Sequence, residues 1–155
     1  MHVNVSHILA GEVGESADFE LAGENPNIPD LELVAPIQGQ VRVRRLDSGV
    51  GVRGRTELAF RLQCFRCLDD YDHRAEVSFE GVYAPRPAED EWPISARGII
   101  DLTPLIRQEA IVSIPMQQLC RTDCEGLCPD CGERLIAGHH HSTQDPAPKP
   151  TDKKG

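Results

Sequence analysis

Apolar and polar residues alternate with a period of two along the middle of the chain, and this alternation predicts β-strands. Val41-Arg42-Val43-Arg44 is the first such stretch, and residues 52–63 and 75–83 form two longer ones. Residues 47–50, Asp-Ser-Gly-Val, are of the types that form a hairpin turn between the first two strands. The pattern therefore predicts an antiparallel β-sheet as the core of the fold.

One main helix is predicted after the sheet. Thr103 can cap its N-terminus, Pro104 suits its first turn, and Pro115 ends it. Sheet and helix together place the chain in the α+β class. Four apolar residues of this region are expected to face the sheet: Leu102, Leu105, Ile106 and Ile111.

Charge is unevenly distributed along the chain. The 155 residues suffice for one globular domain with additions, and the net charge of -9 argues against strong non-specific nucleic-acid binding by the whole surface. Residues 1–40 contain seven acids and no Lys or Arg, whereas residues 41–74 contain eight arginines and five acids. We therefore assign three parts: 1–115, an α+β core domain with an acidic N-terminal segment; 116–141, a cysteine/histidine metal-binding segment; and 142–155, a polar, proline-rich tail predicted to be disordered.

All six cysteines fall into motifs with metal-ligand spacing. The C-terminal motif reads C-x3-C-x3-C-x2-C, and Cys64 and Cys67 repeat the C-x2-C spacing upstream. Two residues between cysteines let one tight turn direct both sulfurs at one ion, and zinc prefers four ligands in a tetrahedron. We predict a structural zinc ion in a C-terminal zinc-knuckle hairpin, held by Cys120, Cys124, Cys128 and Cys131.

Other roles of the cysteines are less well supported. An even number suits a disulfide framework, but the N-terminus lacks the features of a signal peptide, and cytosolic cysteines at these spacings more often bind metal. Catalytic zinc motifs such as H-E-x-x-H are absent from the sequence, and a closed all-sulfur site leaves no coordination position for water. A thiol redox role of Cys64 and Cys67 is opposed by the acidic residues 69–72, which disfavour a thiolate.

The order of these motifs resembles the YceD-like family of bacterial and plastid proteins, the large ribosomal RNA subunit accumulation proteins. The matching features are Cys64-Phe65-Arg66-Cys67, then Ile100-Asp101-Leu102, Ile114-Pro115-Met116, and the stretch 119–135 with its Cys-Pro-Asp-Cys-Gly turn. The resemblance implies a role in synthesis, processing or stability of 23S ribosomal RNA. It implies no established enzymatic activity and no agreed catalytic residue.

The resemblance also bears on the ligands. Many relatives continue with a further C-x-C before an Asp-Pro, where this chain has residues 138–142 ahead of Asp145-Pro146. His139 and His141 can therefore replace these cysteines as ligands, and the chain would then have enough ligands for two metal ions. The alternative is that the histidines form a solvated run. Some relatives keep the first C-x-R-C but lack the C-terminal cluster, which argues against one obligatory site that spans both motifs.

Four arginines are expected to share one face of the predicted hairpin: Arg42, Arg44, Arg53 and Arg55. With the turn centred on residues 48 and 49, Arg42 pairs with Arg55 and Arg44 with Arg53. Directly opposed like charges destabilise a hairpin unless an anion neutralises them. RNA phosphate is one candidate, because arginine donors match its geometry. Neutralisation by the chain's own acids is the alternative.

We expect a cytoplasmic, non-enzymatic factor of ribosome biogenesis, with no small-molecule substrate, whose partners are ribosomal RNA or ribosomal and assembly proteins. A run of about 18 apolar residues is absent, so no membrane span is predicted. The alternative function is a zinc-stabilised adaptor that binds only protein. A thiol redox enzyme is a third, weaker reading.

Overall fold

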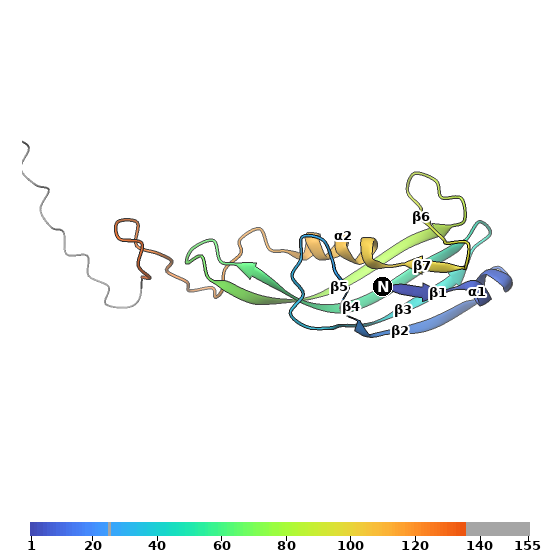
Figure 1. Cartoon of the computed structure of the whole chain (residues 1–155), viewed down its shortest axis with the longest axis horizontal. Helices are drawn as coiled ribbons and strands as arrows, with labels where there is room; N and C mark the ends of the chain where they lie inside the picture. The colour runs from blue at the N-terminus through green and yellow to red at the C-terminus, as the bar shows by residue number, and fades with distance from the viewer. Residues whose placement is uncertain (25, 136–155) are drawn as a thin grey trace, which may run out of the picture.

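The computed structural model describes residues 1–24 and 26–135. Its main sheet has the strand order β2-β3-β4-β5-β6. A second sheet pairs β1 with β7, and helix α2 lies beside it over the main sheet (Figure 1). The elements are β1 (His2–Asn4), α1 (Ser6–Ala10), β2 (Ser16–Glu24), β3 (Ile37–Arg45), β4 (Val50–Gln63), β5 (Asp70–Ala84), β6 (Trp92–Pro93), β7 (Ile99–Asp101) and α2 (Thr103–Ser113).

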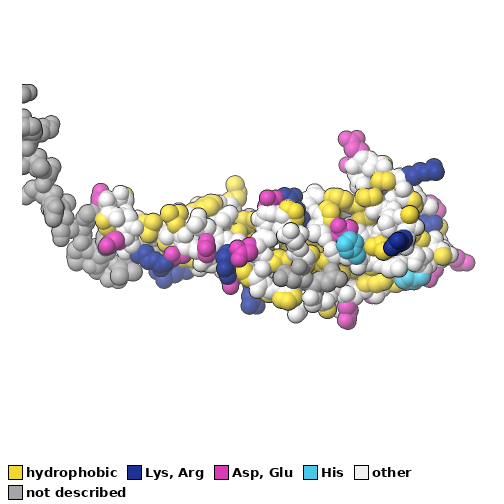
Figure 2. Space-filling model, in the orientation of Figure 1, with side chains coloured by type: hydrophobic (Ala, Val, Ile, Leu, Met, Phe, Trp, Pro, Cys, Tyr) yellow, Lys and Arg dark blue, Asp and Glu magenta, His cyan; other side chains and the backbone are white. Residues whose placement is uncertain are grey.

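The predicted antiparallel core is confirmed for β2 to β5, which pair in chain order. The sheet is mixed only because the two-residue strand β6 runs parallel to β5. The apolar residues of the alternating pattern face the core as predicted, since Val41 and Val43 of β3 and Val52 and Phe60 of β4 are buried. Their neighbours along each strand point to the other face. On the side of the molecule that Figure 2 shows, charged side chains of both signs are interspersed with apolar ones.

Helix α2 lies where it was predicted, but its start differs in detail. Leu102 is the residue at the N-cap, and no side chain of that residue caps the helix. The Asp101 carboxylate accepts a hydrogen bond from the Thr103 N–H at 3.0 Å, so it fills the capping role that had been assigned to Thr103. Leu105 and Ile106 are buried against the sheet as expected, whereas Ile111 is 40% exposed, so its predicted placement was wrong.

The acidic N-terminal segment also contains regular structure that the sequence reading missed. Strand β2 forms an edge of the main sheet, with Ala17, Phe19 and Leu21 alternating with the outward Asp18 and Glu20. The same residues alternate with a period of two in the sequence, which is the signal of a strand. Among the described residues, no helix has the length and apolar character needed to cross a bilayer.

The hairpin of β4 and β5 is longer than its neighbours and reaches away from the body of the fold (Figure 1). β3 pairs with β4 only as far as Glu57, and the pairing of β4 with β5 continues to Gln63 and Asp70. The turn at the end of this hairpin carries the first cysteine pair. The chain that follows α2 runs to the same end, where the second cluster begins.

Candidate metal centre

Four cysteine sulfurs meet at the end of the long hairpin. They belong to Cys64, Cys67, Cys120 and Cys124, and all lie within 4.8 Å of one another. The Sγ atoms of Cys64 and Cys124 are 3.8 Å apart, and those of Cys67 and Cys120 are 3.6 Å apart. Four sulfurs at about 2.3 Å from a tetrahedral zinc ion would be about 3.8 Å apart. The arrangement therefore fits one tetrahedral metal ion.

The first cysteine pair is positioned by the turn that connects β4 to β5. The Leu68 N–H donates to the Cys64 carbonyl at 2.9 Å, and the Cys64 N–H donates to the Asp69 carbonyl at 2.8 Å. Leu68 has a φ of 61°, in the left-handed region that tight turns use. Cys64 is fully buried and Cys67 is 8% exposed, so the turn directs both sulfurs inward.

Arg66 joins this turn to the second cysteine pair. Its Nη1 donates to the Cys124 carbonyl at 2.7 Å, and its own carbonyl accepts from the Leu127 N–H at 3.1 Å. Gly126 has a φ of 89°, and a Cβ at this position would lie 2.9 Å from the Arg66 carbonyl oxygen. Glycine is thus required both by the backbone conformation and by the close approach of the two segments.

Two further contacts lock the segments together. The Phe65 N–H donates to the Gln118 carbonyl at 2.8 Å. Asp69 forms an ion pair with Arg134 and accepts a hydrogen bond from the Cys67 thiol at 3.3 Å. The four sulfurs are therefore held by backbone and side-chain contacts between the two segments.

The backbone around the centre favours a thiolate at Cys64. The N–H of Cys67 donates to the Cys64 sulfur and, against the effect of burial, lowers its pKa to about 6. The N–H of Asp69 acts similarly on Cys67, but burial and the neighbouring Cys64 sulfur outweigh it and raise the pKa of Cys67 to about 12. A bound cation would remove this conflict, because metal ligation stabilises thiolates.

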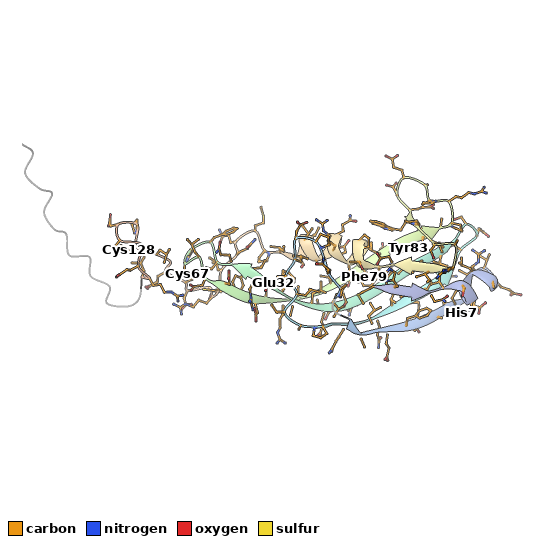
Figure 3. All side chains as sticks on the ribbon, in the orientation of Figure 1. His7, Glu32, Cys67, Phe79, Tyr83 and Cys128 are labelled. Carbon is orange, nitrogen blue, oxygen red and sulfur yellow. The ribbon has the colours of Figure 1, made fainter. Side chains whose placement is uncertain are left out.

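The four sulfurs that lie together share two members with the predicted ligand set of Cys120, Cys124, Cys128 and Cys131. Cys120 and Cys124 meet Cys64 and Cys67 instead of Cys128 and Cys131. Figure 3 shows Cys128 farther out along the molecule than Cys67. The group spans both motifs, because the hairpin turn brings the upstream pair to the downstream cluster. The candidate ligands His139 and His141 lie outside the described residues.

The arginine hairpin has a different register from the predicted one. Arg42 pairs with Arg53, Arg44 with Gly51, and Arg55 with Gln40. The shift is two residues, so each arginine keeps its predicted face, and all four are exposed there. The predicted cross-strand partners were therefore wrong, while the shared face is confirmed.

Acidic residues of the flanking strands neutralise most of this arginine face. Three ion pairs form, at 2.7 Å from Arg42 to Asp18, 2.8 Å from Arg53 to Glu80 and 3.2 Å from Arg55 to Glu76. Arg44 makes no ion pair with any residue that the structure describes. The alternative of neutralisation by the chain's own acids thus holds for three of the four arginines.

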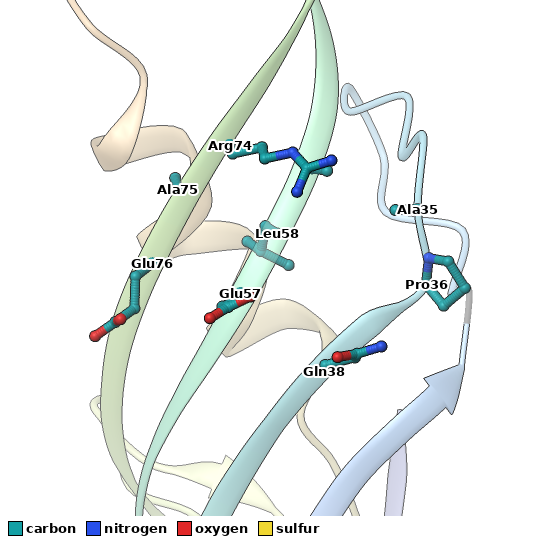
Figure 4. Close-up of a pocket in the computed structure, with 9 residues that line it drawn as sticks. Ala35, Pro36, Gln38, Glu57, Leu58, Arg74, Ala75 and Glu76 are labelled. Atoms are coloured by element: carbon teal, nitrogen blue, oxygen red, sulfur yellow. The ribbon is translucent and has the colours of Figure 1, made fainter.

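The same sheet surface contains an open hollow of about 270 Å³ beyond the arginine face (Figure 4). Its charged lining comes from Glu57, Arg74 and Glu76, and Gln38 adds an amide. Carboxylates and a guanidinium therefore face the same space. The outer sheet surface carries charge of both signs here, as it does along the arginine face.

Fold and site together define an α+β protein whose long β-hairpin carries one half of a four-cysteine group with the geometry of a metal site. The chain belongs to the YceD family, because the family model described as "Large ribosomal RNA subunit accumulation protein YceD" matches residues 52–150. This match includes both cysteine motifs and confirms the resemblance inferred from them.

The curated relatives are mycobacterial proteins. The chain is 35% identical over 130 residues to the uncharacterized protein Rv2926c of Mycobacterium tuberculosis. The aligned region covers 75% of this chain and 63% of that protein. It is 32% identical over 125 residues to the uncharacterized protein ML1660 of Mycobacterium leprae, covering 75% of this chain and 58% of that protein. The chain thus spans about three fifths of the length of these relatives. No solved structure matches it.

Proposed function

We propose that this chain is a non-enzymatic factor that supports the synthesis, processing or stability of 23S ribosomal RNA in the bacterial cytoplasm. The observation that carries the proposal is the family match, which spans both halves of the metal centre. The proposed ion is a structural zinc. Four cysteine ligands fill its tetrahedron, so no position is open for a substrate.

The proposed RNA contact is the arginine face, Arg42, Arg44, Arg53 and Arg55. Exposed ion pairs such as those on this face contribute only about 0–1 kcal/mol each, so phosphate oxygens can replace the carboxylates at small cost. Arginine donors also match phosphate geometry in a bidentate way. Arg44 has no acidic partner to displace among the residues that the structure covers.

The salt dependence of RNA binding tests this contact. We expect a large-subunit ribosomal RNA fragment to bind with a slope of log affinity against log salt of about -3, at roughly -0.7 for each of four phosphate contacts. The double variant Arg42→Gln/Arg55→Gln should reduce that slope by about half. Binding is measured by fluorescence anisotropy over a salt series.

Arg86→Gln/Arg97→Gln is the matched control, because it removes the same charge from two exposed arginines outside this face. It should leave the slope close to that of the wild type. Equal slopes for the wild type and the Arg42/Arg55 variant would remove the arginine face from the mechanism. Absence of wild-type binding at low salt would remove direct RNA contact altogether.

A protein-binding adaptor is the second candidate, and a specific observation favours it. Four large apolar side chains are strongly exposed toward the metal-centre end of the chain: Phe65 at 62%, Leu68 at 56%, Val112 at 75% and Met116 at 97%. Large exposed apolar side chains are typical of protein-interaction surfaces where they form a contiguous patch. In this case the chain would reach ribosomal RNA through ribosomal or assembly proteins, and pull-downs from cell extract would retain those proteins after RNase treatment.

A further inference from the structure

Strand β5 is an open edge of the main sheet over most of its length. It pairs with β4 from Asp70 to Tyr83, and β6 pairs only with Tyr83 and Ala84. Among the described residues, no strand pairs with the other side of β5 between Asp70 and Val82. Figure 4 shows β5 at the border of the sheet. An unpaired edge of this length is a template for a further strand.

The backbone groups of β5 alternate in direction. The Cys64 N–H donates to the Asp69 carbonyl at 2.8 Å, so the odd-numbered residues of β5 exchange hydrogen bonds with β4. The Ile94 N–H donates to the Ala84 carbonyl at 3.0 Å, which shows that the even-numbered residues face the other side. The even-numbered residues of the open stretch therefore present their N–H and C=O groups to a further strand.

The side chains of these even-numbered residues are complementary to themselves. Asp72, Arg74, Glu76 and Ser78 follow each other on the outer face of the sheet, and all four are exposed. Two β5 strands can pair antiparallel around a two-fold axis at Ala75. Arg74 then lies opposite Glu76 of the partner subunit, and Asp72 lies opposite the partner's Ser78. Each charged side chain meets an opposite charge or a hydroxyl, and the axis generates every contact twice.

Neighbouring registers of the same strand pair are less favourable. Even-numbered residues must lie opposite even-numbered ones, so the axis can move along the strand by single residues. An axis at Arg74 or at Glu76 opposes that side chain to its own copy, and opposed like charges destabilise a strand pair. An axis at Val77 places Asp70 of the partner subunit opposite Ala84, a position that β6 occupies.

The charged side chains are available for these contacts. Arg74 makes no ion pair with any residue that the structure describes, and Figure 4 shows its long side chain reaching across β4, from which it can turn to the edge. Glu76 forms an exposed ion pair with Arg55 at 3.2 Å, and a carboxylate can accept from a second guanidinium as well. Glu80, which meets an acid at the end of the paired stretch, is paired with Arg53 at 2.8 Å.

Helix α2 leaves an apolar side chain uncovered beside this edge. Leu105 and Gln108 of α2 line a hollow together with Glu80 and Gly81 of β5, so this side of the helix lies next to the β5 edge. Val112 lies four residues after Gln108, on the same side of the helix, and is 75% exposed. A strand added to β5 would lie beside this side of the helix and cover Val112.

We propose that two copies of this chain associate through their β5 strands, in an antiparallel pair centred on Ala75 that joins the two main sheets into one. The partner is a second copy because the charges from Asp72 to Ser78 are complementary to themselves in this register. The pairing uses none of the four clustered cysteines and none of the four arginines proposed to contact RNA. It can therefore hold or fail separately from the proposed function.

Sedimentation velocity over a concentration series tests the proposal, and we expect a concentration-dependent dimer for the wild type. Arg74→Glu places a glutamate opposite the partner's Glu76 at two symmetric positions, so dimerisation should weaken about tenfold. Arg74→Glu/Glu76→Arg exchanges the two charges and should restore the wild-type affinity. A mass of one chain throughout the series would overturn the proposal, and so would a double variant as weak as the single one.

A proline variant tests the backbone pairing. The Ser78 N–H faces the open edge, so Ser78→Pro removes no hydrogen bond to β4 but blocks the partner's strand. We expect this variant to be monomeric and the control Ser78→Ala to be dimeric. A dimeric Ser78→Pro variant would overturn the proposal.

Hydrogen exchange gives a second readout of the same pairing. In the wild type, the even-numbered amides from Asp72 to Ser78 should exchange fast in dilute solution and slowly in the dimer. The odd-numbered amides bond to β4 and should stay protected at every concentration, and their protection in Ser78→Pro shows that the variant is folded. Even-numbered amides that exchange fast at every concentration would contradict the paired edge.

Discussion

We expect that replacing Cys124 with serine will lower the metal content by one ion per chain and unfold the segment after α2, while the sheet stays folded. Cys124 is 3% exposed and supplies one of four sulfurs at the end of the long hairpin. Metal binding in small zinc modules is largely folding energy, with apparent values of about 10–16 kcal/mol. The sheet has its own hydrophobic core, so we expect the loss of structure to remain local.

Zinc analysis together with hydrogen exchange measures this result. Fast exchange should appear in residues 116–135 and in the 64–69 turn, and β3 and the paired body of β4 should remain protected. Cys128→Ser is the matched control, because it makes the same chemical change outside the four-sulfur group. It should leave the 64–69 turn protected. Retention of the ion and of protection in the Cys124 variant would contradict the assigned ligand set, and global unfolding would contradict the independence of the sheet.

Truncation of Phe60 to alanine lowers the free energy of unfolding by about 3–5 kcal/mol, as expected for a large aromatic residue in a packed core. Phe60 is fully buried on β4, and its ring lies 5.4 Å from that of His73 on β5. Removal of the ring leaves a cavity in the body of the sheet, and close-packed surroundings relax only partly around it. Urea denaturation followed by circular dichroism measures the change.

The chain provides a matched control in Phe65, five residues farther on. Its side chain is 62% exposed at the hairpin turn, so Phe65→Ala makes the same chemical change with little loss of packing. We expect a change within about 0.5 kcal/mol, which is usual for surface substitutions. Equal effects of the two substitutions would show that Phe60 does not contribute to the core as the structure indicates.

The strands and the helix were accessible from the sequence because their signals are local. Period-two alternation in β3 and β4 determines which residues are buried, and it determined the arginine face as well. It does not determine which residues lie opposite each other. A shift of two residues keeps every side chain on its face, so only the geometry of the turn decided that Arg42 lies opposite Arg53.

Charge neutralisation of the arginine face also depended on tertiary structure. Asp18 and Glu80 are far from the predicted hairpin in the sequence, but they flank Arg42 and Arg53 in one row across four strands. The sequence contained enough acids for such pairing without indicating which ones would meet the arginines. Strand order and register made that choice.

The sequence by itself determined the chemistry of the metal centre: six cysteines, two C-x2-C turns, and thiolate ligands suited to zinc. The tertiary structure decided which cysteine sulfurs lie together. Cys64 and Cys124 are separated by 60 residues, and their sulfurs lie 3.8 Å apart. They meet because the long β4–β5 hairpin and the chain leaving α2 end at the same point in space. Spacing along the chain indicates which cysteines lie together in one turn. It does not indicate that two turns meet, and this group takes two cysteines from each of two segments.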